Sequence, residues 1–364
     1  MAYDSIRPGR VWLDTEGKRI QAHGGSVFYE DGVYYWYGEN KEYTDGKNGI
    51  WHWGVRCYSS LDLYNWKDLG LIIPPDTEHE GSSLHPKSMM DRPHIIYNRD
   101  TKKYVCWLKI MNRDKTQTET VLTADRLLGP YRIVREGLKP LNMSAGDFDL
   151  AVAPDGKAYY YFERVHSETI CADLTGDYTD VTGYYSTHFP HTQPPFVREA
   201  TAHFVRKGRH YLITSGTSGY LPNPSQAAVA DSWHGPYTVL GNPHPGDESR
   251  TSYHSQISSV FKVPGKRDLY IACADRWMPE HMHLKYEEYG RMFQLMFDPD
   301  RSFDREKERE YRALQEKMPR DAGSNTSIAD YVWLPLRFEE PSGEHPQGQV
   351  LIDWRDEWRL SDYE

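Results

Sequence analysis

Two strands joined by a tight turn are predicted by the stretch Phe196-Val-Arg-Glu-Ala-Thr-Ala-His-Phe-Val-Arg-Lys-Gly-Arg-His-Tyr-Leu-Ile-Thr-Ser-Gly-Thr-Ser-Gly-Tyr220. Alternating apolar residues flank a Lys207-Gly208 turn, which is typical of a hairpin. Glu199 comes just before the first apolar run, so we expect its carboxyl group at the mouth of a strand. A lone Glu is ordinarily a solvated side chain. The rest of the chain must therefore decide whether Glu199 has a chemical role.

The turn and second strand of this stretch recur along the chain. The copies are Asp31-Gly-Val-Tyr-Tyr35, Asp100-Thr-Lys-Lys-Tyr104, Asp155-Gly-Lys-Ala-Tyr159, Lys207-Gly-Arg-His-Tyr211 and Gly265-Lys-Arg-Asp-Leu-Tyr270. The aligned tyrosines are 69, 55, 52 and 59 residues apart. A second phrase, with an Asp-led turn, follows most copies at residues 59–66, 124–131, 172–178 and 230–237. Chance recurrence in a tyrosine-rich chain is the alternative, but the two phrases keep the same order and similar gaps.

Units of about 50–60 residues with about four strands are typical of β-propeller blades. We therefore predict an all-β fold, a five-bladed β-propeller, as a single domain over residues 1–364, with residues 10–358 as the ordered propeller. A short surface helix with a structural role only is predicted as an insertion at 304–318, where apolar residues recur at helical spacing among charges. Residues 329–338 and 350–358 would complete the last blade, beside an N-terminal strand at 10–14. No appended binding module is expected.

Composition limits the function. The chain has 364 residues, with 27 Tyr and 11 Trp against 11 Phe, which suits half-buried strands and stacking on ring-shaped polar ligands. A net charge of -10 argues against a nucleic-acid partner. No apolar run is long enough to span a bilayer, so no membrane partner is expected. We expect a cytoplasmic protein, because no signal peptide is visible, or a secreted or periplasmic one if a leader has been removed; the oligomeric state is open.

The four cysteines, Cys57, Cys106, Cys171 and Cys273, are widely spaced and form no CxxC motif. We expect buried free thiols rather than a zinc site or disulfides.

Polar segments precede each tyrosine phrase, where a purely structural strand would be apolar. In a propeller the inner strand of each blade directs one end to the mouth of the central channel, so these segments are expected to converge. They are residues 21–25, 90–94, 144–150, 198–201 and 253–258. This shared position distinguishes Glu199 and Asp147 from ordinary surface acids.

Paired carboxyl groups in a sugar-sized cleft are the working parts of glycoside hydrolysis. Glu199 is the candidate general acid, which protonates the leaving oxygen. Asp147 would keep the pKa of Glu199 high through like-charge coupling. Asp149 shares a strand face with Asp147 and is the alternative for that role.

At these residues the chain resembles glycoside hydrolase family 43, over about residues 10–358, and is most similar to the exo-β-1,3-galactanase-type group. The motifs are Gln21-Ala-His-Gly, Tyr35-Trp-Tyr-Gly-Glu39, Arg92-Pro93, Arg198-Glu-Ala, Ile213-Thr-Ser-Gly216, Tyr220 with Pro222-Asn-Pro224, Ser255-Gln256 and Asp275-Arg-Trp277.

The resemblance implies a general acid at Glu199, a pKa-modulating aspartate at Asp147 and a water-orienting or pseudo-base amide at Gln256, which would act as an imidic tautomer. It also implies a set of substrate-binding residues: Gln21, His23, Glu39, Asp91, Arg92, Thr217, Tyr220, Arg276 and Trp277.

The chain departs from the family pattern at two places. Most of the family has an aspartate general base in the first blade, where this chain has Gln21 and His23; the galactanase-like group is similar in lacking that aspartate. Asp91 stands where the galactanase-like group is expected to have Glu, and the shorter side chain alters a contact to a sugar hydroxyl.

The sequence therefore predicts an inverting, exo-acting glycosidase that releases a terminal sugar, with galactose from the β-1,3-galactan of arabinogalactan-type glycans as the favoured product. The enzyme alternatives are an α-L-arabinofuranosidase, a β-galactofuranosidase or a β-xylosidase. A carbohydrate-binding pseudoenzyme is the alternative outside catalysis, since the ordinary base is missing. A protein-interaction propeller would lack the polar channel mouth.

Three histidines and two tryptophans each allow a functional and a structural interpretation. No cofactor is required, but His23, His94 and His254 would flank the channel, where they either hold a structural metal ion or serve as hydrogen-bonded core residues. Trp51 and Trp53, in the insert at 44–54, are either a sugar-stacking platform or blade packing.

Overall fold

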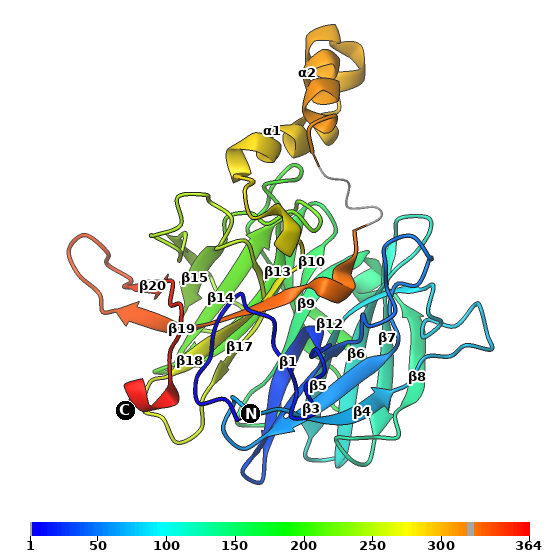
Figure 1. Cartoon of the computed structure of the whole chain (residues 1–364), viewed down its shortest axis with the longest axis vertical. Coiled ribbons are helices and arrows are strands. Elements are labelled where there is room, and N and C mark those ends of the chain that lie inside the picture. The colour runs from blue at the N-terminus through cyan, green and yellow to red at the C-terminus, as the bar shows by residue number, and fades with distance from the viewer. Residues whose placement is uncertain (1, 319–323) are drawn as a thin grey trace.

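The fold is a five-bladed β-propeller, as the repeats predict. The computed structural model describes residues 2–318 and 324–364, and within them five four-stranded antiparallel sheets lie around a central axis (Figure 1). The first sheet holds β1 (His23–Glu30), β2 (Val33–Glu39), β3 (Val55–Ser60) and β4 (Lys67–Ile73). The second holds β5 (Met89–Asn98), β6 (Lys103–Met111), β7 (Gln117–Ala124) and β8 (Arg132–Leu138). The third holds β9 (Ala145–Val152), β10 (Ala158–Arg164), β11 (Glu168–Leu174) and β12 (Val181–His188).

The fourth and fifth sheets repeat this order. The fourth holds β13 (Arg198–Arg206), β14 (Arg209–Gly216), β15 (Gln226–Ala230) and β16 (Thr238–Gly241). The fifth holds β17 (Gln256–Lys262), β18 (Tyr270–Arg276), β19 (Asp330–Glu339) and β20 (Gln349–Ile352). The innermost strands β1, β5, β9, β13 and β17 pack against one another, and each repeated tyrosine lies on the second strand of its sheet.

The hairpins have local causes. Lys207 and Gly208 both have positive φ, 50° and 77°, in the two-residue turn between β13 and β14, as the primed turns of tight hairpins require. In the Asp-led turn between β3 and β4, the Asp62 carboxylate accepts the backbone N–H groups of Tyr64 and Asn65, both at 2.8 Å. Both turns are set by residues within a few positions of one another, which explains why the sequence predicts them.

The last blade closes without an N-terminal strand, so the prediction of a strand at 10–14 is wrong. Leu13 makes only an isolated bridge with Arg19, because the Asp14 carboxylate accepts the N–H groups of Glu16 and Lys18 and turns the chain back. The N-terminal segment instead joins the C-terminal one through an antiparallel bridge between Ile6 and Trp358.

Among the described residues of the connection between β18 and β19, two helices rather than one project from the sheets (Figure 1). The helix α2 (Arg305–Gln315) lies in the predicted segment and begins at Asp304, whose carboxylate accepts the N–H groups of Glu306 and Lys307. The helix α1 (Tyr286–Met296) was not predicted, although Tyr289, Met292 and Phe293 occupy one helical face. Short 3-10 turns are η1 (Pro140–Asn142), η2 (Pro279–His281), η3 (Arg301–Phe303), η4 (Thr326–Ile328) and η5 (Leu360–Asp362).

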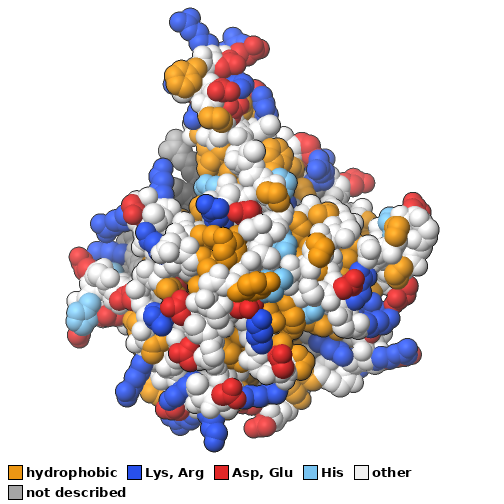
Figure 2. Space-filling model, turned by 180° about the vertical axis from the view of Figure 1, so that it is seen from behind, with side chains coloured by type: hydrophobic (Ala, Val, Ile, Leu, Met, Phe, Trp, Pro, Cys, Tyr) orange, Lys and Arg blue, Asp and Glu red, His pale blue; other side chains and the backbone are white. Residues whose placement is uncertain are grey.

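Aromatic side chains fill the seams between blades. Trp36, Trp66 and Trp333 are buried together between the first and fifth sheets, with ring centroids 4.6–6.0 Å apart. The four cysteines are buried and free, as predicted. No helix in the described residues is long and apolar enough to cross a membrane. On the face seen in Figure 2, Lys and Arg side chains are interspersed with Asp and Glu.

Candidate active site

The inner strands bring their N-terminal ends to one mouth of the channel. All five carry an irregularity in pairing at this end, and such bulges re-aim side chains next to functional sites. The shifts lie between His23 and Ser26, Asp91 and His94, Ala145 and Phe148, Glu199 and Ala202, and Ile257 and Ser259. The sequence placed these segments together, but it did not reveal the bulges.

Glu199 is held at the start of β13 by a strained backbone and a buried neighbour. Ala200 has a φ of 49°, a left-handed conformation that a non-glycine residue adopts at a cost. The buried Arg198 donates to Thr214 Oγ1 at 3.0 Å and to the Thr214 carbonyl at 2.7 Å. Because both residues beside it are fixed, the carboxyl group of Glu199 has a defined position in the cleft.

Asp147 is an ionised carboxylate between two cations. Arg92 Nη2 lies 2.8 Å from Asp147 Oδ2, and Lys109 Nζ lies 2.7 Å from Asp147 Oδ1. Burial by itself raises the pKa of Asp147, but the charges of Arg92 and Lys109 outweigh it and hold the pKa at about 2. Lys109 also lies 3.3 Å from Asp91 Oδ2, so it bridges two carboxylates.

Glu199 has the opposite electrostatic environment. Burial, together with the negative charges of Asp147 and Glu163, raises the pKa of Glu199 well above its ordinary range, although Lys109 and Arg92 oppose the shift. The pKa values of the two carboxyl groups are therefore shifted in opposite directions, upward for Glu199 and downward for Asp147, which is the division that general acid catalysis requires.

Gln256 contacts the acid directly. Its Nε2 donates to Ser215 Oγ at 2.9 Å and to Glu199 Oε1 at 3.3 Å. Its Oε1 accepts from Arg92 Nη2 at 2.6 Å and from Trp277 Nε1 at 3.4 Å. This geometry makes Gln256 an orienting partner of Glu199, and its role in activating water stays a prediction.

A second pair of acidic residues completes the floor of the cleft. Glu39 accepts the Arg92 N–H at 2.9 Å and pairs with Lys41 Nζ at 2.8 Å. Burial, only partly offset by Lys41, raises the pKa of Glu39 to about 7. Asp91 accepts from Trp51 Nε1 at 2.7 Å, and 13% of its side chain is exposed against 2% for Glu39. Asp91 is therefore the more accessible of these two carboxyl groups.

These groups line one cavity of about 340 Å³, a size typical of small-ligand sites. Nine of the twelve predicted site residues line it: Glu39, Asp91, Arg92, Asp147, Glu199, Thr217, Tyr220, Gln256 and Trp277.

The other three predicted residues lie outside the lining. His23 is fully buried, with Nδ1 3.0 Å from Asp275 Oδ1, and burial lowers the pKa of its imidazole. The side-chain N–H of Gln21 donates to a backbone carbonyl, and its side-chain oxygen contacts His23 Nε2. Arg276 lies over the ring of Trp354, 5.6 Å from its centre, and donates to a backbone carbonyl. Gln21 and His23 thus connect the start of the first blade to the fifth blade, while Arg276 ties the fifth blade to the C-terminal segment.

The candidate metal histidines do not form a metal site. No group of three or more His, Cys, Asp or Glu in residues 2–318 and 324–364 is arranged to hold a metal ion. His94 Nδ1 instead lies 2.9 Å from Asp149 Oδ1, and Asp149 also accepts the His203 N–H at 2.6 Å. Both carboxylate oxygens of Asp149 therefore contact groups in the core, so Asp147 is the carboxylate beside the acid.

Several residues in or next to the cleft were not predicted from the sequence. The sequence analysis singled out neither Lys41 nor Lys109, although Lys109 interrupts the apolar run of β6, a signal that could have marked it. His166, Phe293 and Phe297 also line the cavity; His166 comes from a turn, and the two phenylalanines come from the unpredicted α1 and the residue that follows it. Of the two insert tryptophans, Trp51 lines the cavity, while Trp53 packs on Tyr43 with ring centroids 5.0 Å apart.

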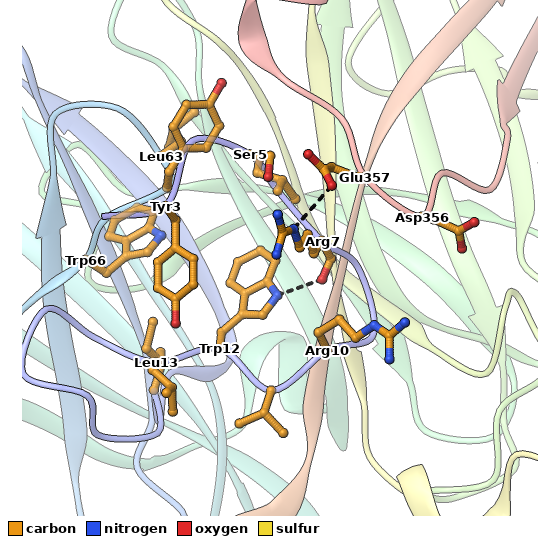
Figure 3. A pocket seen from close by; sticks show the side chains of 14 residues that line it. Tyr3, Ser5, Arg7, Arg10, Trp12, Leu13, Leu63, Trp66, Asp356 and Glu357 are labelled. Atoms are coloured by element: carbon orange, nitrogen blue, oxygen red, sulfur yellow. Dashed lines mark hydrogen bonds and ion pairs between the residues drawn. The ribbon is translucent and has the colours of Figure 1, made fainter. Parts of the chain in front are cut away.

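A larger cavity of about 540 Å³ lies along the N-terminal segment (Figure 3). Its lining includes the rings of Tyr3, Trp12 and Trp66, and its acidic residues, Asp356 and Glu357, are exposed. It holds no buried carboxyl pair, so the smaller cavity is the candidate active site.

Comparisons with known proteins point to the same chemistry. The sequence model of "Glycosyl hydrolases family 43" matches residues 21–303. A solved family 43 β-1,3-galactosidase is similar with a TM-score of 0.74 at 28% identity, over 99% of this chain and 65% of that one. A second, solved with galactodeoxynojirimycin, has a TM-score of 0.74 at 27% identity, over 98% and 100%. The exo-β-1,3-galactanase of Phanerochaete chrysosporium, solved with β-1,3-galactotriose, shares the fold with a TM-score of 0.73 at 22% identity, over 98% and 68%. No curated protein sequence matches the chain.

Proposed function

The chain belongs to glycosyl hydrolase family 43, and we propose that it is an inverting, exo-acting glycosidase that releases terminal galactose from β-1,3-linked galactan. The observation that carries the chemistry is the pairing of Glu199, whose pKa is raised, with the ionised Asp147 in one cavity. The sugar and linkage are supported by the two β-1,3-galactosidases that the structure resembles over almost its full length.

The first step of the proposed mechanism is proton transfer. Glu199 donates its proton to the glycosidic oxygen as the bond to the sugar breaks, because a leaving alkoxide without a proton is too basic to depart. Asp147 remains ionised and keeps the proton on Glu199 until the substrate accepts it. Gln256 fixes the orientation of the Glu199 carboxyl group through a hydrogen bond from its amide N–H.

The second requirement is a water molecule on the opposite face of the sugar ring. Gln256 and Asp91 are the two groups in the cavity that we consider for activating it. Gln256 Oε1 already accepts from Arg92 and Trp277, whereas the Asp91 carboxylate is accessible and flanked by cations.

The acid is tested with Glu199→Gln. We expect the rate on β-1,3-galactobiose to fall by about 10²–10⁴-fold, the usual contribution of a general acid. Hydrolysis of β-galactosyl fluoride should fall less, because fluoride leaves without protonation. Glu248→Gln, at an exposed glutamate outside the cavity, is the matched control. Equal rates for wild type and Glu199→Gln on the disaccharide would rule out this assignment.

The water-activating group is tested by azide rescue. If Asp91 is the base, Asp91→Ala regains turnover in azide and forms a galactosyl azide, and Gln256→Ala does not. The reverse result assigns the role to Gln256. Proton NMR of the first product formed from the wild type should show the α-anomer, as inversion requires; a β-anomer would overturn the mechanism.

A further inference from the structure

The helical insertion supplies part of the wall of the active-site cavity. Phe293 lies in α1 and Phe297 directly follows it, and both line the cavity that holds Glu199. Phe293 is 7% exposed and belongs to the core of the insertion, whereas Phe297 is half-buried. The insertion therefore presents an apolar surface to the same space as the catalytic acid.

Contacts to two other blades hold this surface in place. The ring of Phe297 meets His166 of the third blade edge-on, with centroids 4.9 Å apart at 79°. Gln193, which precedes the fourth blade, donates to the Gln294 carbonyl at 3.1 Å. The Tyr289 hydroxyl donates to a backbone carbonyl of the fourth blade. The wall is thus braced across the mouth by side chains on both sides of the acid.

The cavity separates into a polar floor and an aromatic rim. The floor groups Glu39, Arg92 and Asp147 are at most 7% exposed. The rim includes Trp51 and Tyr220, both half-buried, with ring centroids 6.1 Å apart at 29°. The terminal sugar of the substrate makes many hydrogen bonds and therefore suits the polar floor. The rest of the saccharide must extend past the rim. Aromatic rings there match the apolar C–H face of a galactose unit.

We infer that Phe297, supported by Phe293, is a binding surface for the second sugar of the substrate, the galactose that departs with the leaving oxygen. This inference rests on the proposed function and adds to it, because it assigns the leaving-group sugar to the helical insertion. Loss of an apolar contact of this kind lowers kcat/KM by about 10- to 200-fold. Phe297 would therefore set the preference for a saccharide leaving group over a small one.

The test compares two substrates that share the terminal galactose. β-1,3-Galactobiose has a second sugar, and β-galactosyl fluoride has none. For Phe297→Ala we expect the ratio of kcat/KM for the disaccharide to that for the fluoride to fall about tenfold, mainly through KM. Phe297→Tyr keeps the ring and should keep the ratio. Phe303→Ala removes a phenylalanine of the same insertion that is 89% exposed and lies outside the cavity, and it is the matched control.

The outcomes are separable. A ratio in Phe297→Ala equal to that of the wild type overturns the inference and leaves the proposed function intact. An equal loss on both substrates also overturns it, since the ring would then support the whole site. A wild type that is inactive on every β-galactoside overturns the proposed function and the inference together.

Discussion

Replacing Lys109 with methionine removes the cation that lies between Asp147 and Asp91. Lys109 Nζ is 2.7 Å from the Asp147 carboxylate and 11% of its side chain is exposed. At an effective dielectric constant of about 20, unit charges at this separation attract by about 6 kcal/mol. After the cost of desolvating the ammonium group, loss of one partner from a buried pair lowers stability by about 3–5 kcal/mol. We expect a loss of that size in the free energy of unfolding of Lys109→Met at pH 7.

The loss in the free energy of unfolding of Lys109→Met should depend on pH. Burial raises the pKa of Asp147, but Arg92 and Lys109 hold it at about 2, below its ordinary value of 3.8. A carboxyl group whose pKa is lowered on folding stabilises the protein above its unfolded pKa, and this stabilisation is lost as the pH falls from about 4 to about 2. The difference between wild type and Lys109→Met should therefore be full at pH 5–7 and smaller at pH 3.

Urea unfolding followed by tryptophan fluorescence at pH 7, 5 and 3 measures this difference. Lys103→Met is the matched control, because Lys103 pairs with Asp125 at the surface, where 42% and 82% of the two side chains are exposed. The control should unfold at the wild-type midpoint. A wild-type midpoint for Lys109→Met at pH 7, or a difference that is the same at pH 3, would refute the charge argument.

Two further predictions concern the environment of the acid. Asp147→Asn removes a negative charge that raises the pKa of Glu199 and leaves Arg92 and Lys109 to lower it, so the alkaline limit of the kcat/KM profile should move to lower pH; a limit that stays or rises contradicts this. Gly146→Ala would place a Cβ 2.3 Å from Glu163 Oε2 and should cost about 1–3 kcal/mol of stability. Gly81→Ala, with nothing within 4 Å of the added atom, is its control in the same urea assay; equal midpoints for the two variants would show that Glu163 moves aside freely.

The general acid and its neighbours show how far sequence reasoning reaches in this protein. The equivalent places of Glu199, Asp147 and Gln256 at the starts of inner strands were visible from the repeats, and the structure brings the three together. Gln21 and His23 occupy an equivalent place, yet they point into the packing around Asp275. Period and register predict which end of a strand a residue occupies, but the bulges decide which way its side chain faces.

The sequence by itself determined the five blades, because each depends on turns and alternating strands formed within a few residues. Only the tertiary structure decided the charge of each carboxyl group, since the pKa of Asp147 and of Glu199 depends on burial and on cations contributed by other strands. It also decided that the helical insertion lines the cavity, where Phe297 packs on His166 of the third blade, 131 residues earlier in the sequence. Local patterns fix local geometry, whereas burial and ionisation arise only when the five blades close around one channel.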